Sequence, residues 1–174
     1  MFRKTLYAAL LLSAAVLASH AGQARADQVN ADERMERGKY LVALGGCNDC
    51  HTPGNFLGKP DFVHALSGSE VGFEIPGVGV FHGPNLTPDK VTGLGDWSED
   101  QIVTTLRTGK RPDGRMLAPV MPWMAFSVLT DADAYAIAAY LKSLPAVANK
   151  VPGPFGPTAK PTGFVMRVVA PQSE

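Results

Sequence analysis

The chain has 174 residues, of which 45% are hydrophobic and 18% are charged, the composition of a globular protein and not of a disordered or fibrous one. Its 16 lysines and arginines balance 16 aspartates and glutamates, so the basic excess expected of a nucleic-acid-binding protein is missing. Only two cysteines are present, which excludes a disulfide-dense scaffold, while 18 glycines and 14 prolines predict many turns and little regular structure.

Residues 1–26 have the three parts of a secretory signal peptide. Arg3 and Lys4 give a positive start, Leu6–Ala18 is an apolar run, and Ala24-Arg25-Ala26 is a small-x-small cleavage site. The apolar run is shorter than the roughly 20 residues needed to span a bilayer, so an uncleaved membrane anchor is the weaker interpretation. We expect cleavage after Ala26, export to the periplasm, and no membrane span in the mature chain.

Three segments carry apolar residues at helical spacing, and they predict helices over residues 31–44, 99–108 and 131–144. Ser98 and Gln101 predict a capping box at the start of the second helix, and Thr130 is the expected N-cap of the third. Gly109 and Pro145 follow the ends of these two helices. Helices are therefore the main regular structure that we expect.

About 50 residues rich in glycine and proline separate the first two predicted helices. A structureless loop of that length is unusual in a compact domain, and it makes sense if it wraps a large apolar cofactor. Within it, Gly72–Phe81 is expected to hold a short β-hairpin that turns at Pro76-Gly77.

Both cysteines fall in Cys47-Asn48-Asp49-Cys50-His51, the C-x-x-C-H pattern of c-type haem attachment. Thiols three positions apart are spaced to form thioethers with the two vinyl groups on one porphyrin edge, and His51 then reaches the iron as proximal ligand. A C-x-x-C redox disulfide is the main alternative, but it usually lies in a βαβ unit, whereas a predicted helix precedes Cys47. A zinc site is disfavoured because the chain has no second cysteine pair.

The second axial ligand of such an iron has seven candidates after the signal peptide: His64, His82, Met35, Met116, Met121, Met124 and Met166. We choose Met121, because Pro119 and Pro122 would stiffen the irregular loop that presents its sulfur. Met116 in the same loop is the next choice, followed by a histidine or an open site. A thioether ligand favours ferrous iron, and a six-coordinate iron has no position for a substrate, which describes electron transfer and not catalysis.

From Asp32 to Pro145 the chain resembles a class I cytochrome c, with an N-terminal helix, the C-x-x-C-H motif, a methionine loop and a C-terminal helix in that order. Gly83–Asp89, Thr92–Ser98 and Met121-Pro122-Trp123 resemble the cytochrome subunits of bacterial periplasmic dehydrogenases. The resemblance implies a small all-α fold, with about three main helices around one covalently attached haem c. Its domain would span residues 27–144, followed by a Pro/Gly-rich arm over residues 145–174.

The resemblance also implies roles for single residues. The first and last helices of this family cross closely, which would bring Gly38 against Tyr140 or Leu141. A proline carbonyl usually accepts the N–H of the proximal histidine, and Pro60 and Pro53 are the candidates here.

Three residues of the middle segment have two interpretations each. Asn85 and Thr87 either hydrogen-bond near the haem propionates and orient the methionine loop, or cap a local turn. Trp97 either donates its indole N–H to a propionate or caps the second helix. His64 and His82 are expected in solvated loops.

The predicted protein is a periplasmic electron carrier and not an enzyme. It would take one electron at a time from a dehydrogenase and pass it to another cytochrome or a terminal oxidase. A haem sensor or peroxidase-like enzyme with an open iron site is the first alternative, and a thiol–disulfide oxidoreductase using Cys47 and Cys50 is the second.

Two further segments bear on the choice of partner. A basic cluster either steers an acidic redox partner to the haem edge or is only a solvated face; its members are Arg107, Lys110, Arg111 and Arg115. Apolar residues in the arm of residues 145–174 predict that it packs on its own domain, and the alternative is a strap onto a partner subunit.

Overall fold

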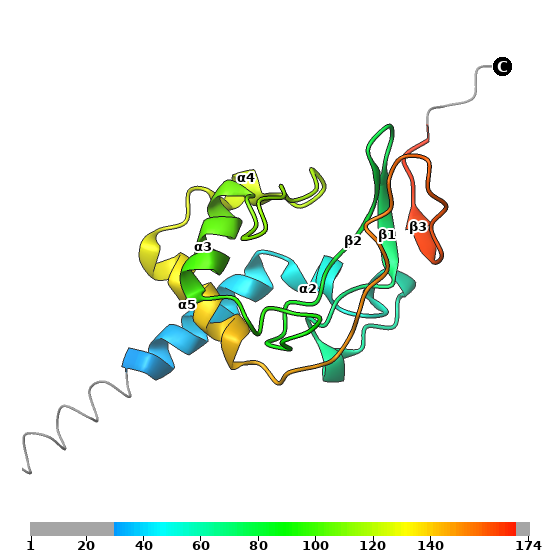
Figure 1. The fold of residues 1–174 in the computed structure, drawn as a ribbon. Helices are drawn as coiled ribbons and strands as arrows, with labels where there is room; N and C mark the ends of the chain where they lie inside the picture. The colour runs from blue at the N-terminus through cyan, green and yellow to red at the C-terminus, as the bar shows by residue number, and fades with distance from the viewer. Residues whose placement is uncertain (1–29, 170–174) are drawn as a thin grey trace, which may run out of the picture.

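The computed structural model describes residues 30–169, so the predicted signal peptide lies outside the described residues. The first helix covers residues 30–44, drawn in blue to cyan in Figure 1. The elements that follow are α2 (Cys47–His51), η1 (Asn55–Leu57), η2 (Phe62–His64), β1 (Val71–Ile75), β2 (Gly79–His82), α3 (Glu99–Thr108), α4 (Trp123–Phe126), α5 (Asp131–Ser143) and β3 (Phe164–Met166).

The long helices begin where their capping residues predict. Ser98 Oγ accepts the Gln101 N–H at 3.1 Å, and Gln101 Oε1 accepts the Ser98 N–H at 3.0 Å, so the predicted capping box of α3 is confirmed. Thr130 Oγ1 accepts the Asp133 N–H at 3.1 Å and caps α5. The helix α5 ends at Ser143, one residue earlier than expected.

The N-terminal helix and α5 cross at Gly38. A Cβ atom on Gly38 would lie 2.1 Å from the carbonyl oxygen of Ala136 and 2.8 Å from the Cβ of Tyr140. The two backbones therefore touch, and the predicted pairing of Gly38 with Tyr140 is confirmed.

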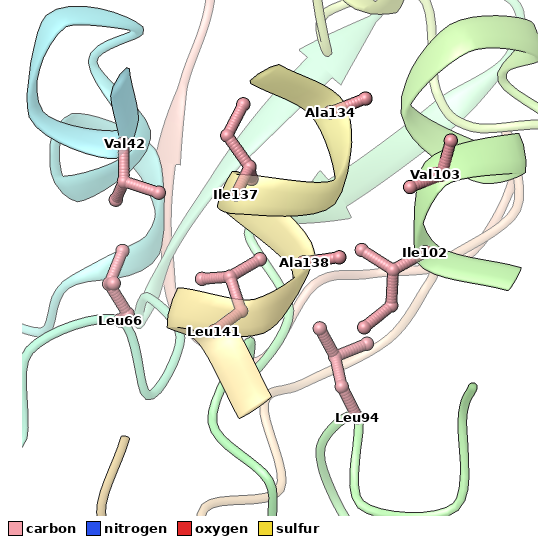
Figure 2. Close-up of a cluster of buried hydrophobic side chains, with 9 residues drawn as sticks. All are labelled: Val42, Leu66, Leu94, Ile102, Val103, Ala134, Ile137, Ala138 and Leu141. Carbon is pink, nitrogen blue, oxygen red and sulfur yellow. The ribbon is translucent and has the colours of Figure 1, made fainter. Parts of the chain in front are cut away.

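The core lies between three helices (Figure 2). Side chains of α5 occupy its middle, with the N-terminal helix on one side and α3 on the other. The buried members are Val42, Leu66, Leu94, Ile102, Val103, Ala134, Ile137, Ala138 and Leu141. The small residues Ala134 and Ala138 let neighbouring chain segments approach α5 closely, as the sequence pattern suggests.

The predicted hairpin is confirmed as β1 and β2, which pair antiparallel from Gly72↔His82 to Ile75↔Gly79. A third strand, β3, pairs parallel with β1 and gives the sheet order β2-β1-β3. The expectation of an all-α fold thus needs this small sheet added to it. The sequence did not indicate β3, because three residues are too few to show an alternating pattern.

The chain after α5 folds back over the rest of the molecule. It runs beside the loops next to α2 and then reaches the hairpin, where Phe155 and Val80 exchange backbone hydrogen bonds of 3.0 and 2.9 Å (Figure 1). As far as residue 169, the arm therefore packs on its own domain, as predicted. Within residues 30–169, no helix is both long and apolar enough to cross a bilayer.

Candidate functional site

The two cysteines lie on one turn of α2. This five-residue helix starts after Gly46, whose φ of 66° lets the chain turn sharply out of the first helix. Residues three positions apart lie on the same face of a helix, so the two thiols point from one side, and they are not joined to each other. That arrangement matches a pair of attachment points along one edge of a flat group.

The electrostatics of the thiols weigh against a thiol–disulfide enzyme. Burial raises the pKa of Cys47 to about 11 and also raises the pKa of Cys50. A reactive redox cysteine needs the opposite shift, because the thiolate is the nucleophile. Residues 30–169 contain no group of three or more His, Cys, Asp or Glu side chains able to hold a metal ion.

His51 ends α2 and is 5% exposed. Its Nδ1 lies 2.7 Å from the carbonyl oxygen of Pro84, to which it donates a hydrogen bond. Burial lowers the pKa of His51, so the ring is neutral. A neutral ring with its proton on Nδ1 leaves the lone pair of Nε2 free for a metal. No described residue hydrogen-bonds to Nε2.

The expectation that Pro60 or Pro53 accepts this hydrogen bond is wrong. Pro53 instead accepts the Asp61 N–H at 2.9 Å, inside the turn that follows α2. The acceptor comes from 33 residues further along the chain, because Gly83 lets this segment lie directly on α2. A Cβ atom on Gly83 would be 1.8 Å from the Cys50 carbonyl oxygen, so a residue with a side chain would push Pro84 away from His51.

Asn85 and Thr87 form a buried hydrogen-bonded turn. The Asn85 side-chain oxygen accepts the Thr87 N–H at 2.9 Å and the Thr87 hydroxyl at 2.7 Å. Its amide nitrogen donates to Thr92 Oγ1 at 3.0 Å and to the Val147 carbonyl at 2.7 Å. Both N–H groups of the Asn85 side-chain amide therefore donate to acceptors within the protein. These contacts agree with the interpretation in which Asn85 and Thr87 cap a local turn.

Trp97 lies beside the basic cluster. The guanidinium carbon of Arg111 lies over the Trp97 ring, 5.1 Å from the ring centroid. The carbonyl oxygen of Trp97 accepts a 2.9 Å hydrogen bond from Lys142 Nζ. The residue directly precedes the N-cap Ser98. Within the described residues, its indole N–H makes no hydrogen bond, so that donor is available.

The basic cluster is partly neutralised by acidic neighbours. Arg107 pairs with Asp131, while Arg111 and Arg115 both pair with Asp113. The hydrogen bond from Arg115, with smaller contributions from Arg111, lowers the pKa of Asp113 to about 2. This part of the surface is therefore less positive than its count of arginines implies.

Met121 lies in a loop that is held on both sides. Its N–H donates to Ala118 at 2.9 Å, and its carbonyl accepts the Trp123 N–H at 2.8 Å. The Trp123 ring packs on the end of α3, where a Cβ atom on Gly109 would be 2.6 Å from it. Met121 is half-buried, whereas Met116 and Met124 are 57% and 65% exposed. The fold therefore fixes the backbone that presents the Met121 sulfur.

Two histidines have different surroundings from each other. His64 is on η2 with its side chain half-exposed and paired with Asp61, as expected for a solvated residue. The same expectation for His82 is wrong, because His82 ends β2, is 8% exposed and packs beside Phe155. The predicted hairpin ends at Phe81. Alternate residues of a strand share one face of the sheet, so extending the strand by one residue would have placed His82 on the same buried face as Val80.

A family model for cytochrome c matches residues 35–145. The chain belongs to the cytochrome c family. It is 38% identical over 121 residues to the fructose dehydrogenase cytochrome subunit of Gluconobacter japonicus, which covers 68% of this chain and 24% of that protein. It is also 38% identical over 119 residues to the cytochrome c subunit of a quinone alcohol dehydrogenase from Gluconacetobacter polyoxogenes, covering 67% of this chain and 25% of the relative.

A diheme cytochrome c-type protein of Cereibacter sphaeroides is 44% identical over 117 residues, covering 64% of this chain and 36% of the relative. The chain thus spans only about a quarter to a third of the length of these relatives. The matched family is one of cytochromes, and two of these three relatives are cytochrome subunits of dehydrogenases.

The residues of α2 fit a c-type haem. Two unpaired thiols lie one turn apart, and the next residue is a buried neutral histidine whose Nδ1 is already committed to Pro84. A thioether from the methionine loop would complete the donor set, and sulfur is a suitable ligand for haem iron.

Proposed function

We propose that this chain is a single-haem, class I c-type cytochrome that carries one electron at a time. Cys47 and Cys50 hold the haem through thioethers, His51 Nε2 is the proximal ligand, and Met121 is the distal ligand. The observation that carries the proposal is the 2.7 Å contact between His51 Nδ1 and Pro84 in a buried site next to both cysteines. When bound there, haem c supplies a one-electron redox couple.

The protein residues control that couple in three ways. Pro84 fixes the tautomer and orientation of the His51 ring and raises its basicity as a ligand. The two thioethers keep the group attached to α2. A stiff loop around Met121 presents a thioether, which favours the ferrous state and leaves no open position for a substrate. These features support a carrier and not a catalyst.

The proposed partners follow from the relatives. Cytochrome subunits of fructose, gluconate and alcohol dehydrogenases are similar to this chain, so we assign a dehydrogenase as electron donor. The acceptor would be another cytochrome or a terminal oxidase. Residues 1–26 would direct export to the periplasm, where the haem is attached and the partners meet.

Optical spectra of the exported, purified protein test the assignment. We expect a low-spin c-type spectrum, with a weak sulfur-to-iron charge-transfer band in the oxidised state. A high-spin spectrum would favour an open-site sensor or peroxidase-like enzyme. Absence of haem absorbance, in a host competent for haem attachment, would overturn the cytochrome assignment and leave Cys47 and Cys50 as a thiol pair.

The distal ligand has its own matched pair of variants. Met121→Ala should keep the covalent haem, lower the reduction potential and let the ferrous iron bind carbon monoxide. Met116→Ala, five residues earlier in the same loop, should leave the potential and the spectrum unchanged. The reverse result would transfer the ligand role to Met116.

A further inference from the structure

The arm after α5 is attached to the segment that holds the proximal histidine. The match to the cytochrome c family ends at residue 145, and the arm continues beyond it to residue 169 of the described chain. Its first residues run beside the loop that follows β2 (Figure 1). The contacts there are polar, buried and specific, which distinguishes them from the loose packing of an ordinary tail.

The first attachment is at Val147. Its carbonyl accepts the Asn85 amide N–H at 2.7 Å, and its N–H donates to the Thr87 hydroxyl at 3.1 Å. The Thr87 hydroxyl in turn donates to Asn85 Oδ1 at 2.7 Å. Asn85 and Thr87 are only 2% and 1% exposed. The backbone of the arm therefore adds these two hydrogen bonds to a buried turn, beside those that Asn85 and Thr87 make with each other and with Thr92.

The second attachment is at Asn149. Its N–H donates to Thr92 Oγ1 at 3.1 Å, and its side-chain amide donates to the Ser67 carbonyl at 2.9 Å. Next to Ser67, the N–H of Gly68 donates to the His51 carbonyl at 2.7 Å. The arm thus touches both segments that hold His51, one through its ring and one through its backbone.

The peptide group between Pro84 and Asn85 links the arm to the proximal ligand. The carbonyl that accepts the His51 proton belongs to the same rigid plane as the Asn85 N–H and Cα. A movement of Asn85 therefore tilts the Pro84 oxygen. Because the Asn85 side chain is anchored on Val147, the arm fixes the direction of that oxygen.

We propose that residues 147–149 of the arm position the Pro84 carbonyl against His51 and so set the strength of the proximal hydrogen bond. Asn85, Thr87 and Asn149 are positioning residues in this scheme. A stronger bond to Nδ1 makes the ring a more basic ligand, which stabilises ferric iron. Loosening the arm therefore weakens the bond and raises the reduction potential. This inference rests on the proposed function.

The test uses two variants of the full-length holoprotein, Thr87→Val and Asn149→Ala. Thr87→Val removes the hydroxyl that joins Val147 to Asn85 while keeping the side-chain shape. Asn149→Ala acts from the arm alone, because its amide contacts Ser67. Reduction potential and the exchange rate of the His51 Nδ1 proton, followed by NMR, are measured in both. We expect a higher potential and proton exchange faster by about fivefold or more, as for the loss of one or two hydrogen bonds.

Two control variants separate positioning from general loosening. Arg167→Ala removes the ion pair between the far end of the arm and Glu74 on β1. Thr130→Ala removes the cap of α5 and lowers the melting temperature without touching the arm. Neither should change the potential or the exchange of the ring proton.

Each result decides a different point. If Asn149→Ala keeps the wild-type reduction potential and proton-exchange rate, the arm has no positioning role. This holds even if both quantities change in Thr87→Val, because Thr87 would then act independently of the arm. The role of the arm is also overturned if Thr130→Ala, at a similar loss of melting temperature, changes the reduction potential and proton exchange as much as Asn149→Ala does. If Thr87→Val does not fold, Asn149→Ala alone decides. A wild-type protein without haem refutes the proposed function itself, and with it this inference, whereas normal wild-type spectra with unshifted variants refute only the inference.

Discussion

The crossing of the N-terminal helix and α5 gives the sharpest stability prediction, through the substitution Gly38→Ala. The added methyl group would lie 2.1 Å from the Ala136 carbonyl oxygen, about 1.3 Å short of the 3.4 Å at which ordinary contact begins. That oxygen is backbone of a buried helix, so no side chain can move aside. The helices must separate by about an ångström, and gaps of that size lose a quarter to a half of the dispersion energy of each contact.

The magnitude follows from two opposing effects. Alanine in place of glycine favours a helix by about 1 kcal/mol. Overpacking of a filled core costs about 1–3 kcal/mol, and the separation also loosens the packing around Val42 and Tyr140. We expect a net loss of about 1–2 kcal/mol in the free energy of unfolding. For a chain of this size, that loss lowers the melting temperature by about 2–8 °C.

Denaturation of the holoprotein, followed by far-UV circular dichroism, measures the effect. Gly156→Ala is the matched control, because its added methyl group has nothing within 4 Å and its φ is not in the left-handed region. It should be neutral or stabilising by a few tenths of a kcal/mol. A Gly38→Ala protein as stable as the wild type would refute the conclusion that the two backbones are in contact.

Two further predictions concern one partly buried lysine and one buried histidine. Lys142→Met removes the ammonium that donates to the carbonyls of Leu94, Gly95 and Trp97, and should cost about 2 kcal/mol in chemical denaturation, while the exposed Lys160→Met stays neutral. Burial lowers the pKa of His82, so below about pH 6.5 the unfolded chain binds a proton that the folded chain does not. Stability should therefore fall from pH 7.5 to pH 5 less steeply in His82→Leu, and equal slopes would contradict this.

Signals within a few residues of each other predicted the fold best. Ser98 with Gln101 predicts the start of α3, and Thr130 predicts the start of α5. These predictions succeed because an N-cap hydrogen bond joins residues only three positions apart. The hairpin turn at Pro76-Gly77 is equally local. The C-x-x-C-H motif belongs to this class, since one helical turn brings both thiols and the histidine together.

Contacts between distant segments could not be predicted in the same way. The family resemblance offers Pro60 and Pro53 as acceptors of the His51 proton, yet β2 returns Pro84 to α2 from further along the chain. The signal was present in Gly83, which is needed where two backbones touch. Its meaning depended on knowing which backbone lay beside it. The short strand β3 also pairs with a distant segment, since each of its residues lies 93 positions after its partner on β1 (164 − 71 = 93).

The arm shows how such distant contacts can determine the site itself. Its composition predicted that it packs on its own domain, but not that Val147 completes the hydrogen bonds of Asn85. Asn85 adjoins the carbonyl that orients His51, so a segment beyond the family match reaches the proximal ligand through one peptide plane. Without the arm, the Asn85 side-chain amide would lose its hydrogen bond to the Val147 carbonyl.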